Sequence, residues 1–62
     1  MTVRTLILSD FTNDKTKYVI RRNSVVIISG NWFNDNILNY SMCFIIKFSF
    51  DIDKNKIIVD LL

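Results

Sequence analysis

The chain contains no histidine, proline, alanine, glutamate or glutamine, and only one cysteine and one glycine. Because Cys43 has no second cysteine to pair with, no disulfide can form within the chain, and without histidine a zinc site has too few ligands. Alanine, glutamate and glutamine are among the best helix formers, so their absence disfavours long helices. We therefore expect no metal ion, no other cofactor and a chain built mostly of strands.

Catalysis also finds few candidate residues. There is no histidine to act as a general base, every acidic residue is an aspartate, and no basic residue adjoins Cys43 to activate its thiol. A domain of this size also has little room to enclose a substrate pocket. We therefore predict a protein that is not an enzyme and takes no small-molecule substrate.

What the chain does contain is a surplus of apolar residues. Half of the 62 residues are hydrophobic, and many of them are β-branched or aromatic, as suits a pleated sheet. A chain of this length forms one domain, residues 1–62, close to the lower size limit for independent folding. Such domains usually draw extra stability from disulfides, metals or partners. With the first two excluded, we expect self-association as a homodimer or contact with another protein.

Composition and apolar runs also bear on origin and location. Residues with A/T-rich codons (Ile, Asn, Lys, Phe and Tyr) are abundant, which predicts an A/T-rich genome such as that of a low-GC bacterium, its phage or its plasmid. No apolar run approaches the roughly 18 residues of a membrane span. The run Leu6–Leu8 is too short for the core of a signal peptide. We therefore expect a cytoplasmic protein that does not contact a membrane.

The strongest secondary-structure signal lies in Tyr40–Ile52. Every even-numbered position there is apolar or aromatic, whereas the odd-numbered positions are mostly small or charged. An alternation with period two is typical of a strand and is incompatible with a helix. A hairpin turn at Lys54–Asn55 would follow. Its register sets three apolar pairs on one face: Ile52 with Ile57, Phe50 with Val59 and Phe48 with Leu61.

Three further strands are expected before this hairpin, namely Thr2–Phe11, Thr16–Arg21 and Val25–Ile28. Polar turns at Asn13–Asp14 and Arg22–Asn23 would join them into a meander. The sequence thus predicts an all-β domain of about five antiparallel strands, with a three-stranded meander before a C-terminal hairpin. This order is compatible with an SH3-like barrel and equally with an open sheet.

The connection from Gly30 to Asn39 is the one irregular stretch. Asn34, Asp35 and Asn36 have the polar side chains that cap a short helical turn. Trp32 and Phe33 lie in the same connection, and exposed aromatic side chains are typical anchors of protein contacts or platforms for stacked bases. The alternative is that one ring closes an end of the core. We expect the exposed ring of this pair to bind a protein partner.

Basic residues suggest a second kind of site. Lys17, Arg21 and Arg22 cluster near Tyr18, so their charges would contact phosphates while the ring stacks on a base. The alternative is that these charges are merely solvated beside a turn. A small nucleic-acid-binding β-barrel is therefore the second function hypothesis.

Apolar residues on the second face of the predicted strands suggest a surface for self-association, which a monomer would leave exposed to water. This set consists of Val26, Ile28, Cys43, Ile45, Ile58 and Leu62.

Together these patterns favour a non-enzymatic protein that works by binding another macromolecule. Small size and an A/T-rich origin point to an accessory protein of a phage or mobile element that binds and inhibits or modulates a host protein. A structural subunit of a larger assembly is a third hypothesis, since small β folds serve many unrelated functions.

Overall fold

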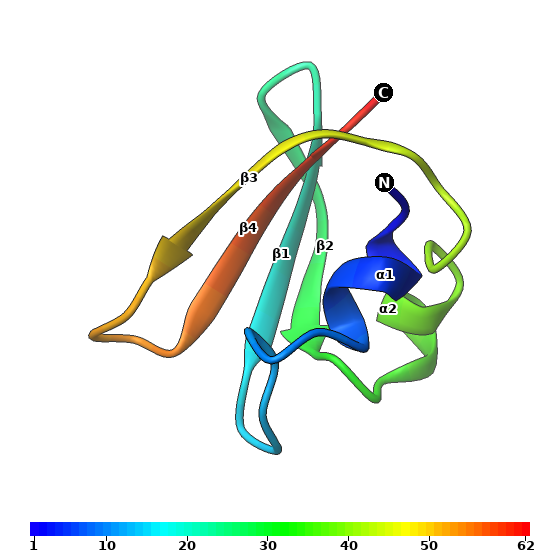
Figure 1. Ribbon diagram of the computed structural model, residues 1–62. Coiled ribbons are helices and arrows are strands. Elements are labelled where there is room, and N and C mark those ends of the chain that lie inside the picture. Colours follow the sequence, from blue (N-terminus) through cyan, green and yellow to red (C-terminus); the bar gives the residue numbers. More distant parts are fainter.

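The computed structural model describes all residues, 1–62, as a four-stranded sheet with two short helices (Figure 1). Strands β1 and β4 lie at the centre and pair in parallel, while β2 and β3 form the two edges and pair antiparallel with their central neighbours. An all-β small domain is thus confirmed, but the sheet has four strands rather than five, does not close into a barrel, and is mixed rather than wholly antiparallel because β1 and β4 run in the same direction. The elements are α1 (Val3–Ile7), β1 (Lys17–Arg22), β2 (Val25–Asn31), α2 (Asp35–Leu38), β3 (Ile45–Asp51) and β4 (Lys56–Leu61).

The predicted N-terminal strand Thr2–Phe11 is wrong, because its first half forms helix α1. The buried residues Val3, Leu6 and Ile7 are three and four positions apart, which places them on one helix face. Thr2 caps the helix, since its hydroxyl oxygen accepts a hydrogen bond from the Thr5 backbone N–H at 3.3 Å. The β-branched composition of this segment concealed its helical spacing.

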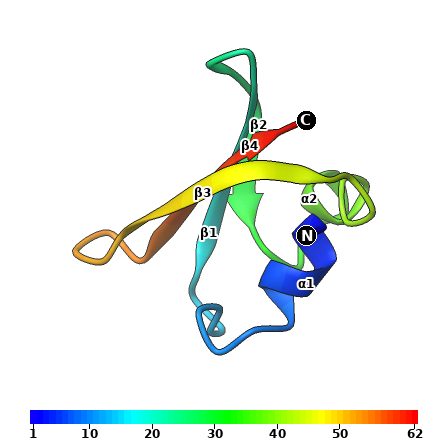
Figure 2. The same cartoon turned by 45° about the horizontal axis from the view of Figure 1, so that its top comes forward.

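Helix α2 confirms the prediction of a capped helical turn. The Asn34 side-chain oxygen accepts a bond from the Asn36 backbone N–H at 3.0 Å, and Asn34 is the N-cap of the helix. Ile37 is fully buried, and its side chain anchors the helix to the core. Figure 2 shows both helices on the same side of the sheet.

The first hairpin joins β1 and β2 through Asn23 and Ser24, one residue later than predicted. Both residues have positive φ values, 54° and 64°, as a two-residue hairpin turn of the primed kind requires. The register then shifts by one residue, because Arg21 lies opposite Val26 whereas Ile20 lies opposite Ile28. An extra residue in an edge strand of this kind is a β-bulge.

The second hairpin joins β3 and β4 in a register two residues away from the predicted one. Asp51 pairs with Lys56 and Phe50 with Ile57, so the loop spans four residues, 52–55, instead of two. A shift by two keeps each side chain on its expected face, because the side-chain period of a strand is two. The apolar face was therefore predicted correctly although the partners were not.

The predicted strand over Tyr40–Ile52 is also shorter in the structure, where β3 covers only Ile45–Asp51. A second bulge lies between Ile45 and Lys47, and it ends the regular alternation. Ile46, at the bulge, is 63% exposed instead of buried on the even-numbered face. One additional residue in the strand has thus turned an expected core residue toward solvent.

The core lies between the two helices and one face of the sheet. Side chains from both central strands alternate toward this face, and the helices supply the opposing layer. Fully burying such a side chain contributes about 1.5–3 kcal/mol relative to leaving it exposed. The buried hydrophobic residues are Val3, Leu6, Ile7, Tyr18, Ile20, Ile37, Ile57, Val59 and Leu61.

The opposite face of the sheet carries no helix and is called the open face below. Strand neighbours that lie directly opposite each other point to the same face, so the register defines three rows across it. One row contains Asn31, Lys17, Lys56 and Asp51; the next contains Ser29, Val19, Ile58 and Ser49; the third contains Val26, Arg21, Asp60 and Lys47.

Candidate functional site

Three phenylalanine rings gather beside β3. The ring centroids of Phe48 and Phe50 are 5.7 Å apart, and Phe11, from the loop after α1, lies 4.7 Å from Phe50 and 6.2 Å from Phe48. Tilted aromatic contacts add about 0.5–1.5 kcal/mol beyond the burial of area. Phe48 packs against the core, whereas Phe11 is 55% and Phe50 39% exposed. This group therefore extends the core to the protein surface.

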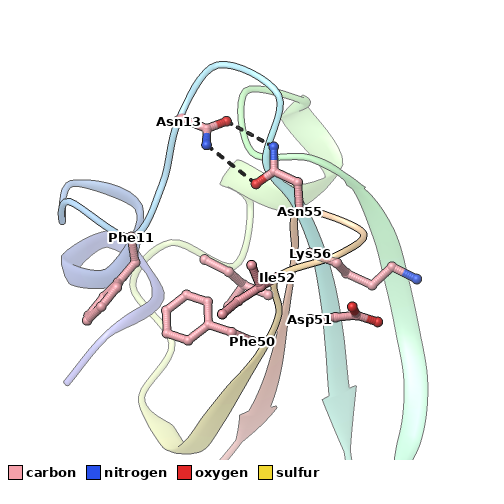
Figure 3. Close-up of a pocket in the computed structure, with 8 residues that line it drawn as sticks. Phe11, Asn13, Phe50, Asp51, Ile52, Asn55 and Lys56 are labelled. Atoms are coloured by element: carbon pink, nitrogen blue, oxygen red, sulfur yellow. Dashed lines mark hydrogen bonds between the residues drawn. The ribbon is translucent and has the colours of Figure 1, made fainter.

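A surface hollow of about 450 Å³ lies beside these rings. Its apolar wall contains Phe11, Phe50, Ile52 and Ile57, and Figure 3 shows Ile52 close to the Phe50 ring with Phe11 facing both. Ile52 is 87% exposed, the largest exposure of any large hydrophobic residue in the chain. An apolar wall with a polar rim is the usual composition of a binding site. The rim consists of Asn13, Asp51, Asn55 and Lys56.

A group of polar residues fixes the loop that bears Ile52. The side-chain amide of Asn55 donates to the Asn13 side-chain oxygen at 3.1 Å, and the buried Thr16 hydroxyl donates to the Asn55 side-chain oxygen at 3.1 Å. Asn55 has a positive φ of 50°, which asparagine tolerates better than most residues. Asn13 and Asn55, two residues of the rim, are thus held by contacts between segments 39 and 42 residues apart.

The edge of β3 leaves backbone groups without a partner strand. The Lys17 backbone N–H donates to the Asn55 carbonyl at 3.0 Å, so Ile57 and every second residue after it in β4 direct their backbone groups toward β1. Phe48 and Phe50 pair with these residues, and their own N–H and C=O groups therefore point away from the sheet. The free edge and the apolar hollow adjoin at Phe50.

Trp32 and Phe33 take different positions in the structure. Trp32 is partly buried and packs against the core, while Phe33 is 54% exposed. Their ring centroids lie 5.5 Å apart in an edge-to-face contact. Phe33 follows β2, at the sheet edge opposite to β3. The contact of Phe33 with a partner remains a prediction, at a place separate from the hollow.

The residues predicted to bind nucleic acid are not brought together. Tyr18 is fully buried, and its hydroxyl lies 2.6 Å from that of Thr12, so it offers no ring for stacking. Burial raises the pKa of Tyr18, and the hydrogen bond to Thr12 partly opposes this. Lys17 and Arg21 point to the open face, whereas Arg22, next in the strand, points to the other side. The stacking role assigned to Tyr18 is therefore wrong.

Arg21 is already engaged within the protein. Its guanidinium donates two hydrogen bonds to the carboxylate of Asp60, at 2.8 and 2.9 Å. These bonds hold the pKa of Asp60 below its ordinary range, with a further contribution from Lys47, and they raise the pKa of Arg21. A phosphate would have to compete with Asp60 for this arginine.

The residues predicted for self-association are divided between the core side of the sheet and more exposed positions. Ile28, Cys43 and Ile45 are partly buried against the core, whereas Val26 and Leu62 are 55% and 77% exposed. The sixth member, Ile58, is half-buried in the middle row of the open face. The structure therefore does not form a single apolar patch from this set.

The residues of the hollow were not predicted as a site. Phe11 was placed at the end of a strand, and Phe50 and Ile52 were assigned to the inward face of a hairpin. One signal in the sequence was available: Ile52 lies between Asp51 and Asp53, a position more typical of a turn than of a buried strand. The proximity of Phe11 to Phe50 depends on the helical N-terminus and had no local signal.

No protein-family model, curated protein or solved structure gives a significant match to this chain. Neither of the two helices has the length and apolar character needed to cross a membrane.

Proposed function

We propose that the protein acts without catalysis, by binding another protein along the free edge of β3 and the adjoining hollow. The observation that carries this proposal is the distribution of apolar residues. Fourteen large hydrophobic residues are exposed, whereas the core contains nine buried ones. Three of the exposed residues, Phe11, Phe50 and Ile52, line the hollow together. An exposed apolar patch on a small protein marks an interaction site, and here it meets a strand edge able to form backbone hydrogen bonds.

The binding mode would be the addition of a strand. An extended segment of the partner pairs with β3 through backbone hydrogen bonds, which supply affinity for any sequence, and inserts an apolar side chain beside Phe50 and Ile52, which supplies specificity. The Asn55 contacts keep the rim of the hollow in place before binding, so little ordering cost arises. By occupying a partner's segment, the protein would inhibit or modulate that partner sterically, as the small size and A/T-rich origin suggested.

Selection from a displayed library of short random peptides tests this function. Peptides with alternating apolar residues should be enriched on the wild-type protein, and their affinity should fall at least about tenfold for Phe50→Ala. Val25→Ala, at the exposed end of the β2 edge, is the matched control and should bind them unchanged. Selected peptides that bind both variants as tightly as wild type would remove the hollow from the account.

The open face supports a second candidate, the binding of nucleic acid. Its three rows contain the cations Lys17, Arg21, Lys47 and Lys56 and only two aspartates, so this face alone accounts for the chain's net charge of +2. Clustered cations bind phosphates, and the affinity falls steeply with salt. Fluorescence anisotropy of labelled DNA and RNA at about 50 and 200 mM salt tests it. Strong binding at the lower salt, weakened by Lys17→Ala and Lys56→Ala, would favour this candidate, and no binding at the lower salt would discard it.

A further inference from the structure

The sequence of β3 is symmetric in chemical character about Ser49. Phe48 and Phe50 flank it, and the next residues outward are Lys47 and Asp51, of opposite charge. A two-fold symmetric contact requires a surface that is complementary to itself. A strand that places a cation and an anion at equal distances from its midpoint meets this requirement when it pairs antiparallel with its own copy.

The backbone groups of β3 satisfy the same geometry. Phe48 and Phe50 direct their N–H and C=O groups away from β4, as argued above from the register. In an antiparallel pair centred on Ser49, Phe48 lies opposite Phe50 of the second copy, and residues directly opposite in this way exchange both backbone hydrogen bonds. The free groups of the edge would therefore be matched on both sides of the axis.

Charge complementarity extends from β4 of one copy to β4 of the second copy. Within one copy, Asp51 lies opposite Lys56, and Lys47 lies opposite Asp60. Pairing about Ser49 sets Asp51 against Lys47 of the second copy, so the charges from Lys56 through Asp51 to Lys47 and Asp60 of the second copy alternate in sign. Opposite charges directly across two strands are stabilising, and like charges are destabilising.

Other symmetric registers lack this match. An axis at Lys47 or at Asp51 would place two like charges against each other, and an axis at Phe48 would leave each charge opposite an uncharged residue. An axis at Phe50 would set Lys47 only against Asp53, which lies in the loop beyond β3, and would leave Asp51 opposite Ser49. The other edge strand, β2, carries no charged residue at all, so it has no comparable means of fixing a register. Charge therefore selects both the edge and the alignment.

We infer that the protein bound at the β3 edge is a second copy of this chain, paired antiparallel about a two-fold axis through Ser49 to form one continuous eight-stranded sheet. This inference rests on the proposed function, because it names the partner of the same edge. Ile46 and Ile52, which are 63% and 87% exposed, come to lie against each other across the axis and are removed from water.

Charge reversal tests the pairing by sedimentation velocity over micromolar to millimolar concentrations. Wild type should reach the mass of a dimer, and Lys47→Asp and Asp51→Lys should each weaken dimerisation at least about tenfold, because each sets like charges together twice. An equimolar mixture of the two variants should regain the wild-type affinity, since the mixed pair has opposite charges at both positions. A mixture no tighter than either variant alone would contradict the inference.

Cross-linking gives a measurement that does not depend on charge. Residues opposite each other between bonded pairs have Cα atoms about 4.5 Å apart, within the range of a disulfide. In a Cys43→Ser background, Ser49→Cys should form a covalent dimer on mild oxidation. Ser29→Cys, exposed on the same face but in β2, is the matched control and should stay monomeric.

The outcomes separate this inference from the proposed function. If wild type stays monomeric and Ser49→Cys does not cross-link, while Phe50→Ala still abolishes peptide binding, the second copy is excluded and the binding function stands. If Phe50→Ala changes neither dimerisation nor peptide binding, both are excluded. Folding of each variant is checked by its thermal unfolding, because Asp51→Lys also removes the bond that the Asp51 side chain accepts from the Lys54 backbone N–H at 3.3 Å.

Discussion

The two hairpins of this protein have the same construction, but their edge strands have different surroundings. In each, a central strand is paired with an edge strand that contains a one-residue bulge. In the first hairpin, α2 packs against the edge strand β2. In the second, the edge strand β3 has no helix along most of its length and instead borders an apolar hollow. The backbone edge of β2 is free as well, so the comparison indicates that the apolar hollow beside β3, and not a free edge alone, gives this small sheet a direction for binding.

The turns of the two hairpins are also fixed by different means. The first turn depends on local backbone conformation, with positive φ at Asn23 and Ser24. The second depends on Asn55, whose side chain bonds to Asn13 and Thr16 in the segment before β1. The turn of the first hairpin is thus fixed by the backbone of its own residues, whereas the turn of the second is held by side-chain contacts with a distant part of the chain. The predictions below test this difference.

The largest effect on stability is expected at Asn55. Asn55→Ala removes the acceptor of the buried Thr16 hydroxyl and puts an alanine at positive φ, for a combined loss of about 2–4 kcal/mol. Asn23→Ala has only the backbone cost, about 1–2 kcal/mol. Urea denaturation at a fixed low protein concentration measures both. Equal losses in the free energy of unfolding would show that the Asn55 side-chain contacts do not stabilise the second turn.

Substitution of Phe50 tests whether self-association uses the β3 edge rather than the β2 edge. Phe50→Ala should weaken self-association by about 2 kcal/mol, or roughly 30-fold, as expected for an aromatic residue at the centre of a contact. Val25→Ala, in the β2 edge, should leave the dissociation constant unchanged. Dilution in an analytical ultracentrifuge gives both values. The account of the edges fails if the two substitutions have the same effect.

The ion pair between Arg21 and Asp60 links the hairpins through β1 and β4. Because the folded state lowers the pKa of Asp60, this carboxylate stabilises the fold fully above its ordinary pKa of about 3.9 and loses that contribution as the pH falls through the lowered value. Asp60→Asn should therefore reduce stability at neutral pH and flatten its dependence on pH in the acid range. Thermal unfolding between neutral and acid pH measures this, and an unchanged slope would contradict the assignment.

The smallest effect is expected in the first turn. Ser24→Gly relieves the cost of a side chain at positive φ but increases the freedom of the unfolded chain, for a net gain of up to about 1 kcal/mol. Binding at the β3 edge should not change. A loss of stability would mean that the Ser24 side chain has a role that its contacts do not explain.

Much of the sheet was predictable from the sequence because its signals are local. Period-two alternation identified the strand around Phe48, polar turns delimited the strands around Tyr18 and Ile28, and the cluster of asparagines identified the cap of α2. The register of the second hairpin was wrong because a four-residue loop was taken for a two-residue one. Both bulges escaped notice because a single inserted residue has no separate signature in a sequence as apolar as this one.

The candidate site was less predictable, because it is assembled from distant segments. Phe11 reaches Phe50 only after the first residues form α1, and the Asn13–Asn55 contact joins positions 42 residues apart. Parallel pairing of β1 with β4 also had no local signal, although it determines which backbone groups of β3 remain free. By contrast, the symmetric arrangement of Lys47 and Asp51 about Ser49 is visible in the sequence, but it gains meaning only once β3 is known to be an edge.

Hydrogen exchange resolved to single amides tests most directly whether the β3 edge is the binding edge. The amides of Phe48 and Phe50 should exchange fast in dilute protein and become protected at high concentration, as the edge pairs with a second copy. The Ser29 amide, which points outward from β2, should exchange fast at both concentrations. Protection at Ser29 instead, or no change at Phe48 and Phe50, would contradict the account.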